Sequence, residues 1–188
     1  EGAERMSNLI AGLLDYSRVG AGERRRERVG LQGLLADVLA ELETAIQDTG
    51  ARVTHDELPE VLGDPLQLAQ LLRNLLSNAL KFRSAERPSR IQISAPQETN
   101  GMVTLAVSDN GIGFDEKYLD RIFQPFQRLN RDLKFAGTGI GLAICRKVVE
   151  YHGGSITATS KPGQGARFVV SLPASQSKEK SSNGSKTG

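Results

Sequence analysis

The segment from Asp64 to Phe82 constrains the fold most, because it predicts one long helix with a strongly apolar side. An aspartate followed at once by proline, as in Asp64-Pro65, is a typical helix start. Five leucines recur along this segment at helical spacing: Leu71, Leu72, Leu75, Leu76 and Leu80. We expect these leucines to pack against a β-sheet, which places the helix in a layered domain.

The periodicity on both sides of this helix alternates between helical and extended patterns. Helical patterns cover residues 31–46, 116–122 and 138–152. Extended patterns cover residues 52–55, 61–62, 90–95, 102–109, 155–160 and 166–172. This order of elements predicts a mixed sheet with helices on one face, which is an α+β two-layer α/β sandwich.

A separate amphipathic helix is predicted at the start, over residues 3–19. Its apolar residues lie on one side: Met6, Leu9, Ile10, Leu13 and Leu14. This stripe could pack on the domain that follows, but a basic stretch separates the two patterns, so we favour a helical bundle. We divide the chain into a bundle helix (1–20), a connector (21–28), the main domain (29–173) and a disordered tail (174–188).

Composition limits the class of protein. The chain has 188 residues, 38% of them hydrophobic, and a formal net charge of +2, which suits one globular domain and does not call for nucleic acid. Cys145 is the only cysteine, so no internal disulfide can form, and no apolar run approaches the ~20 residues that span a bilayer. We expect a cytoplasmic piece without membrane contact. Because it opens on Glu1 within a helix, we expect it to be part of a longer protein.

A first chemical motif lies on the helix LLRNLLSNALKF. Asn74, Asn78 and Phe82 recur every four residues, with Lys81 beside them, so the two amides share one face of the helix. Buried amides without partners cost roughly 1 to 3 kcal/mol each, so these need a ligand or a loop to bind. Taken alone, the pair is explained better by asparagines that cap or brace a loop.

A second motif, DNGIGF, follows a predicted strand at residues 109–114. Its glycines allow a sharp turn or a close approach to a ligand, and a carboxylate such as Asp109 can accept a hydrogen bond from an exocyclic amine. A simple tight turn explains the same residues equally well.

A third motif, GTGIGL, opens the predicted helix at residues 137–142. Free N–H groups and the helix dipole favour a phosphate at such a position. The motif is not a Rossmann fingerprint, because it lacks the preceding strand and the GxGxxG spacing. It is not a P-loop either, since Leu142 and Ala143 stand where lysine and a hydroxyl residue would follow.

In this order, the three motifs resemble the N, G1 and G2 boxes of the histidine kinase catalytic domain, within the Bergerat-type GHKL ATPase superfamily. FQPF at residues 123–126 resembles the F box of that family. The resemblance covers about residues 29–173. The opening segment ERMSNLIAGLLDYSRV is similar to the second helix of the dimerisation and phosphotransfer domain, and FQRLNRDLKFAGTGIGLAICRKVVEYHGG is most similar to phytochrome-linked and PAS-linked members, which have a short lid.

The resemblance implies that the domain binds ATP and Mg²⁺. Asp109 would accept a hydrogen bond from the adenine amino group, Gly111 and Gly113 would shape the turn, and Asn78 would coordinate the metal. The implied catalytic residues, which also bind ATP, are Asn74 and Lys81. The implied phosphate-binding segment contains Gly137, Thr138, Gly139, Gly141 and Leu142. Three cations of the lid at residues 128–136 could offset phosphate charge or simply be solvated: Arg128, Arg131 and Lys134.

The resemblance also implies a histidine kinase rather than an ATPase. Hydrolytic relatives carry a water-activating glutamate where Asn74 stands, and an amide cannot act as that base. Neither His55 nor His152 suits the role of phosphoacceptor: the first follows a predicted strand, and the second is better explained as a helix C-cap. The acceptor would lie on a first bundle helix that this chain lacks. The intact protein would be a homodimer and would pass phosphate to an aspartate of a response regulator receiver domain.

One departure and two alternatives accompany the resemblance. Ala166 and Arg167 stand where relatives often place serine or threonine, which puts part of the adenine support in doubt. A nucleotide-dependent binding module, in which ATP moves the lid without chemistry, is an alternative that a sequence does not exclude. An anti-sigma serine kinase of the same superfamily is disfavoured by the preceding bundle helix.

Overall fold

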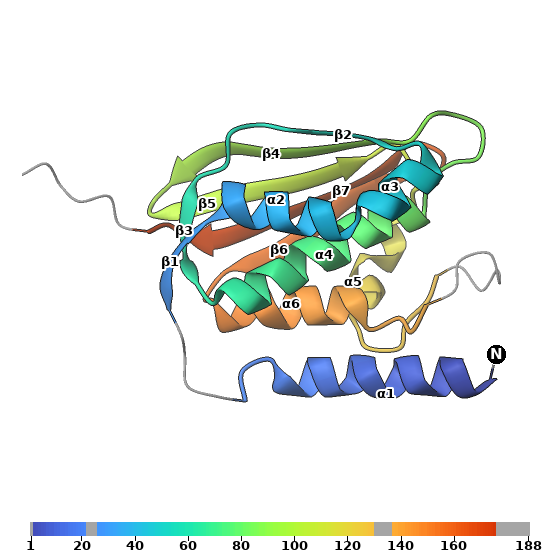
Figure 1. The fold of residues 1–188 in the computed structure, drawn as a ribbon, viewed down its shortest axis with the longest axis horizontal. Helices are drawn as coiled ribbons and strands as arrows, with labels where there is room; N and C mark the ends of the chain where they lie inside the picture. The colour runs from blue at the N-terminus through green and yellow to red at the C-terminus, as the bar shows by residue number, and fades with distance from the viewer. Residues whose placement is uncertain (1, 22–25, 130–136, 176–188) are drawn as a thin grey trace, which may run out of the picture.

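A five-stranded mixed sheet forms one layer of the domain in the computed structural model, which describes residues 2–21, 26–129 and 137–175 (Figure 1). The strands are β2 (Arg52–His55), β4 (Arg90–Thr99), β5 (Met102–Asp109), β6 (Ser155–Lys161) and β7 (Gly165–Pro173). Their order across the sheet is β2-β4-β5-β7-β6. Only β2 and β4 pair in parallel, and the other three pairs are antiparallel.

Helices cover one face of this sheet, as Figure 1 shows. They are α2 (Leu31–Glu41), α3 (Glu43–Thr49), α4 (Pro65–Lys81) and α6 (Gly141–Tyr151). The five leucines predicted to pack inward from α4 are all 4% exposed or less. At roughly 1.5 to 3 kcal/mol for each fully buried leucine, this side of α4 is a major source of stability. The predicted two-layer α+β sandwich is therefore confirmed.

A histidine, His152, connects the end of α6 to the start of α4. Asp64 caps α4, because its carboxylate accepts hydrogen bonds from the amides of Leu66 and Gln67 at 2.9 and 3.2 Å. His152 ends α6 and is fully buried: its Nδ1 donates to the carbonyl of Val148 at 2.7 Å, and its Nε2 accepts from the amide of Asp64 at 2.9 Å. These bonds require the neutral ring, and burial lowers the pKa of His152 in agreement. The predicted C-cap is confirmed.

The structure differs from the sequence prediction around the first helix of the domain. The helical pattern over residues 31–46 forms two helices, because the backbone at Leu42 leaves the helical conformation between α2 and α3. In addition, β1 (Glu27–Gly30) pairs antiparallel with β3 (Glu60–Gly63) in a small second sheet. Two residues of the expected connector, Glu27 and Arg28, thus belong to a strand, and Arg28 forms an ion pair of 2.7 Å with Glu60.

Two other boundaries also shift. The pattern over residues 116–122 forms a 3₁₀ turn, η1 (Glu116–Tyr118), followed by the single turn α5 (Leu119–Ile122). At the end of the domain, Ala174 and Ser175 are ordered although they were assigned to the tail: Ala174 donates to the carbonyl of Gly101 at 2.8 Å and bridges to Val61. Residues 176–188 lie outside the described residues.

The opening helix, α1 (Gly2–Arg18), lies alongside α6 (Figure 1). The ammonium of Lys147 on α6 donates to the carbonyl of Tyr16 at 2.7 Å and lies 4.5 Å from the centre of its ring. The apolar stripe remains open, since four of its residues are 50% to 64% exposed: Met6, Ile10, Leu13 and Leu14. Among the described residues, no helix combines the length and apolarity needed to cross a bilayer.

Candidate functional site

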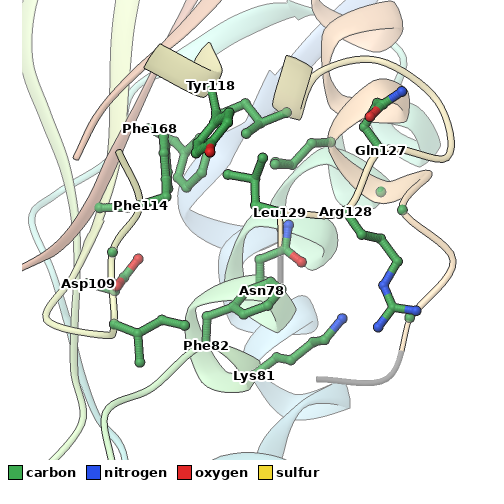
Figure 2. A pocket seen from close by; sticks show the side chains of 18 of the residues that line it. Asn78, Lys81, Phe82, Asp109, Phe114, Tyr118, Gln127, Arg128, Leu129 and Phe168 are labelled. Carbon is green, nitrogen blue, oxygen red and sulfur yellow. The ribbon is translucent and has the colours of Figure 1, made fainter. Parts of the chain in front are cut away.

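A cavity of about 640 Å³ lies between α4, the turn after β5 and the start of α6 (Figure 2). Most of the predicted site residues line it: Asn74, Asn78, Lys81, Asp109, Gly113, Arg128, Gly137, Thr138, Gly139, Gly141 and Leu142. Gly111 is buried within the turn and does not line the cavity. Arg131 and Lys134 lie outside the described residues. A cavity of this size suits a nucleotide-sized ligand.

Asp109 provides the acidic group at one end of the cavity. Its Oδ1 accepts a hydrogen bond from the amide of Gly111 at 2.8 Å, and the amide of Ala166 stabilises the same carboxylate. Burial raises the pKa of Asp109, and these two backbone hydrogen bonds oppose that rise only in part. A ligand amine that donated to the free side of this carboxylate would compensate its lost hydration.

The replacement of a hydroxyl residue by Ala166 has a structural explanation. Asp109 and Ala166 face each other across β5 and β7, so the main chain of β7 supplies an N–H group to the carboxylate. The next residue, Arg167, donates from its guanidinium to the hydroxyl of Ser108 at 3.0 Å and is exposed. The support for the acidic group therefore comes from backbone amides rather than from a side-chain hydroxyl.

The DNGIGF turn packs between the end of α4 and the turn that joins β6 to β7. The amide of Ile112 donates to the carbonyl of Phe82 at 2.9 Å, and the carbonyl of Ile112 accepts from the amide of Gly163 at 2.7 Å. Gly113 has a φ of 62°, and a Cβ there would collide with the carbonyl oxygen of Lys161. Both the left-handed conformation and the close approach require glycine at this position.

Aromatic rings form the apolar walls beside Asp109. Phe114 and Phe168 lie 6.4 Å apart between ring centres with their planes tilted by 40°, and Figure 2 shows Tyr118 next to them. Flat apolar surfaces of this kind suit a planar ring system. Sequence reasoning missed Tyr118 and Phe168, because a single aromatic residue in a strand or short helix indicates only core packing. Phe114 could have been selected from the sequence, because it ends the DNGIGF motif.

The opposite end of the cavity is amide-rich and cationic. Figure 2 shows Lys81 and Arg128 on the side away from Asp109, with Asn78 near the middle. Burial lowers the pKa of Lys81, and the neighbouring charge of Arg128 lowers it further. Because burial and a neighbouring cation both oppose the charge on Lys81, this end of the cavity favours an anionic ligand, which would stabilise that charge.

Asn74, on α4, has an unsatisfied hydrogen-bond donor and lies beside the start of α6. Its side-chain nitrogen is buried, and no hydrogen-bond partner exists for it among the residues that the structure describes. The thiol of Cys145, a weak hydrogen-bonding group, lies beside its side chain. A Cβ on Gly141 would lie 3.5 Å from the Asn74 oxygen, so the amide packs directly on the first residue of the helix. An orphaned donor of this kind suits an oxygen-rich ligand.

The helix α6 begins later in the glycine-rich segment than predicted. The helix begins at Gly141 rather than Thr138, so Gly137 to Gly139 form a loop that precedes it. Gly139 has a φ of 73° and lies against the carbonyl of Gln127, the residue directly before the expected lid. Within the part of the chain that the structure describes, no side chain caps the helix, so its first N–H groups suit an anion.

The donor set fits Mg²⁺ only together with a phosphate-bearing ligand. Within the described residues, no group of three His, Cys, Asp or Glu side chains could hold a metal. The side chain of Asn78 lines the cavity and offers one hard oxygen. Mg²⁺ commonly takes few protein ligands and completes its shell with water and substrate phosphates, so one amide oxygen beside a phosphate site is compatible with it.

Known proteins with a similar sequence or fold identify the family of this chain. The sequence matches the family described as histidine kinase-, DNA gyrase B-, and HSP90-like ATPase over residues 63–176. Cyanobacterial phytochrome A from Nostoc sp. is 41% identical over 187 residues, which cover 100% of this chain and 24% of the relative. The chain thus spans about a quarter of that relative's length, and the similarity agrees with the predicted phytochrome-linked type.

Two solved structures extend the comparison. Full-length ShkA in complex with AMPPNP gives a TM-score of 0.75 at 29% identity, over 88% of this chain and 35% of that chain. The nucleotide-free catalytic domain of the histidine kinase ThkA gives a TM-score of 0.67 at 26% identity, over 79% of this chain and 97% of that chain. The family match spans α4, the turn after β5 and α6, the elements that enclose the cavity. The chain belongs to the family of histidine kinase-, DNA gyrase B- and HSP90-like ATPases.

Proposed function

We propose that this chain is the ATP-binding catalytic module of a sensor histidine kinase, which transfers the γ-phosphate of ATP to a histidine on a separate helix. One observation carries the proposal: a single cavity has a partly buried carboxylate beside aromatic rings at one end and amides with two cations at the other. Adenosine triphosphate has the matching polarity, with an amino-bearing aromatic base and a polyanionic tail.

The proposed roles follow from the positions of the side chains. Asp109 accepts a hydrogen bond from the adenine amino group, and Phe114 and Phe168 pack on the base. Lys81 and Arg128 offset the phosphate charge, together with the N–H groups at the start of α6. Mg²⁺, held by Asn78 and the phosphates, would supply further charge neutralisation. Arg131 and Lys134 of the lid would offset further phosphate charge.

Transfer rather than hydrolysis is favoured by Asn74. Its amide lies where hydrolytic relatives carry a glutamate, and it can orient a phosphate but cannot activate water as a base. Phosphoryl transfer needs mainly positioning and charge neutralisation, which the cavity offers without a base of its own. Neither histidine suits the acceptor: His152 is buried with both ring nitrogens bonded, and His55 lies on β2 at the sheet edge.

The open stripe of α1 is the basis for the proposed partners. Four exposed apolar residues at helical spacing suit packing against other helices, as in a homodimeric bundle that carries the acceptor histidine. A response regulator receiver domain would then take the phosphate. We place the module in the cytoplasm, where ATP is abundant and a lone thiol such as Cys145, which is buried here, stays reduced.

Calorimetry with Mg-ATP tests the binding part of the proposal. The chain should bind Mg-ATP, and Asn78→Ala should weaken binding by about tenfold in the presence of Mg²⁺ and far less in EDTA, since the lost group is a metal ligand. Asn8→Ala, on an exposed position of α1, is the matched control and should bind like the parent. Absence of Mg-ATP binding by the folded parent chain would refute the proposed function.

Transfer is tested with radiolabelled ATP and a longer protein. Extended at the N-terminus by a helix with a candidate acceptor histidine, the protein should become labelled, and the label should be acid-labile, as expected for phosphohistidine. The Asn78→Ala variant of the same protein should stay unlabelled. Nucleotide binding without any labelling in the extended protein would favour a binding module that responds to ATP without chemistry.

A further inference from the structure

Arg87 binds the DNGIGF turn, although it does not line the cavity itself. It lies in the loop between α4 and β4, and its Nε donates to the carbonyl of Asn110 at 2.8 Å. Its Nη2 donates to the carbonyl of Gly111 at 3.0 Å and also to that of Gly163. One guanidinium therefore ties the DNGIGF turn to the turn between β6 and β7. The rigid, planar donor set of arginine suits such a multiple contact.

The side chain of Asn110, in turn, binds the loop that carries Arg87. Its Nδ2 donates to the carbonyl of Pro88 at 2.9 Å, and its Oδ1 accepts from the amide of Arg90 at 2.8 Å. The loop that carries Arg87 is thus fixed just after that residue, at Pro88 and Arg90. Arg87 is held in place by the turn that it binds, so the contact is part of a closed network rather than a single surface hydrogen bond.

The peptide unit between Asn110 and Gly111 connects this network to the acidic group of the cavity. Its carbonyl accepts from Arg87, and its N–H donates to Oδ1 of Asp109 at 2.8 Å. Because a peptide unit is planar and rigid, fixing its oxygen also fixes the direction of its N–H bond. A charged donor on the oxygen also polarises the unit and strengthens the N–H as a donor.

We propose that Arg87 is a positioning residue for base selection, which orients the Asp109 carboxylate through the peptide between Asn110 and Gly111. The inference rests on the proposed function, because it concerns how the same cavity recognises an adenine amino group. Arg87 touches neither the base nor the phosphates. Its effect on base selection would pass through Asp109, and this distinguishes it from a residue that only stabilises the fold.

The test compares two nucleotides in calorimetry: Mg-ATP and the triphosphate of purine riboside, which lacks the exocyclic amine. Arg87→Ala should weaken binding of ATP by about tenfold and binding of the analogue much less. In an Asp109→Asn background, Arg87→Ala should cause little further loss of ATP affinity, because both changes remove the same interaction. Arg28→Ala, which removes an exposed arginine paired with Glu60, is the control and should leave both affinities unchanged.

The opposite results would overturn the inference. Equal losses for both nucleotides, or losses that add in the double variant, would mean that Arg87 only stabilises the turn. Should Arg87→Ala fail to fold, Arg87→Lys serves instead, since it keeps the charge and loses the planar set of donors; an intermediate ratio of the two affinities is expected.

A second measurement needs no nucleotide. Hydrogen exchange of the Gly111 amide should be faster in the folded Arg87→Ala variant than in the parent, while amides of α4 exchange as before. This readout separates the two proposals: a parent that binds no nucleotide refutes the proposed function, and the exchange rate of Gly111 still decides whether Arg87 holds the peptide. An unchanged rate in the variant would contradict the inference.

Discussion

Replacement of Asp109 by asparagine should separate ligand recognition from folding. The carboxylate of Asp109 has two acceptor oxygens and lines the cavity: Oδ1 accepts from the amide of Gly111, and the amide of Ala166 also donates to the carboxylate. An asparagine has one acceptor and one donor, so its NH₂ group must point either at Gly111 or at the ligand amine, and either choice sets two donors against each other. Loss of a hydrogen bond to a charged group costs about 1.5 to 3 kcal/mol, which corresponds to a roughly 10- to 150-fold weaker affinity for ATP.

The same substitution should not destabilise the free protein at neutral pH. Burial raises the pKa of Asp109 above its value in the unfolded chain, so the charged carboxylate opposes folding once it ionises. This unfavourable contribution is absent below the unfolded pKa of about 4, develops as the pH rises, and is complete above the folded pKa. Asp109→Asn removes it. We therefore expect an unfolding free energy at pH 7 equal to or above that of the parent, with the difference shrinking as the pH falls towards about 4.

Calorimetry and urea unfolding between about pH 4 and 8 check both parts. Asp37→Asn, on the exposed side of α2, is the matched control and should leave the affinity for ATP unchanged. A variant that loses affinity equally for ATP and for the purine riboside analogue would show that Asp109 supports the turn rather than the amine. Parental affinity for ATP would remove Asp109 from the site altogether.

Three further predictions concern the core, the turn and the cationic end. Leu75→Ala removes a side chain that is 1% exposed and should lower the unfolding free energy by about 2 to 5 kcal/mol in urea. Gly33→Ala, within α2 and with open space for a Cβ, should raise it by up to about 1 kcal/mol, whereas Gly113→Ala should lower it by more than about 1 kcal/mol. Lys81→Met should weaken Mg-ATP binding by about tenfold in calorimetry, and added salt should reduce the difference from the parent.

The elements with strong local signals were predicted well from the sequence. The helix α4 has a cap, a proline at its first turn and leucines at helical spacing, so its start at Pro65 was predictable. In contrast, β1 has only Val29 buried among its four residues, so it lacks the alternation that indicates a strand. The break at Leu42 was also missed, because neither glycine nor proline marks it and both helices continue the same apolar pattern.

The candidate site was predictable only where its residues form compact motifs. Asn74, Asn78 and Asp109 belong to short patterns whose polarity conflicts with simple core packing, so they could be selected. Phe168 lines the cavity but reads as an ordinary strand residue, because its place beside Asp109 depends on the pairing of β5 with β7. Arg87 was missed for a related reason. It donates to three backbone carbonyl groups, which every residue type has, and the two turns that it joins are far apart in the chain.

The position of α1 leaves most of its apolar stripe open, although another side of the helix packs on the domain. One side of the helix meets the domain: a Cβ on Gly12 would lie 3.0 Å from the side chain of Ile140, and Tyr16 accepts from Lys147. The exposed residues Ile10 and Leu14 point away from these contacts and stay free for other helices. Since Ile140 directly precedes α6, whose first residue lines the cavity, the helix that would meet a partner also packs on the segment proposed to bind phosphate. A shift of α1 within a bundle would therefore act on the cavity by direct contact, without any need for a change in the sheet.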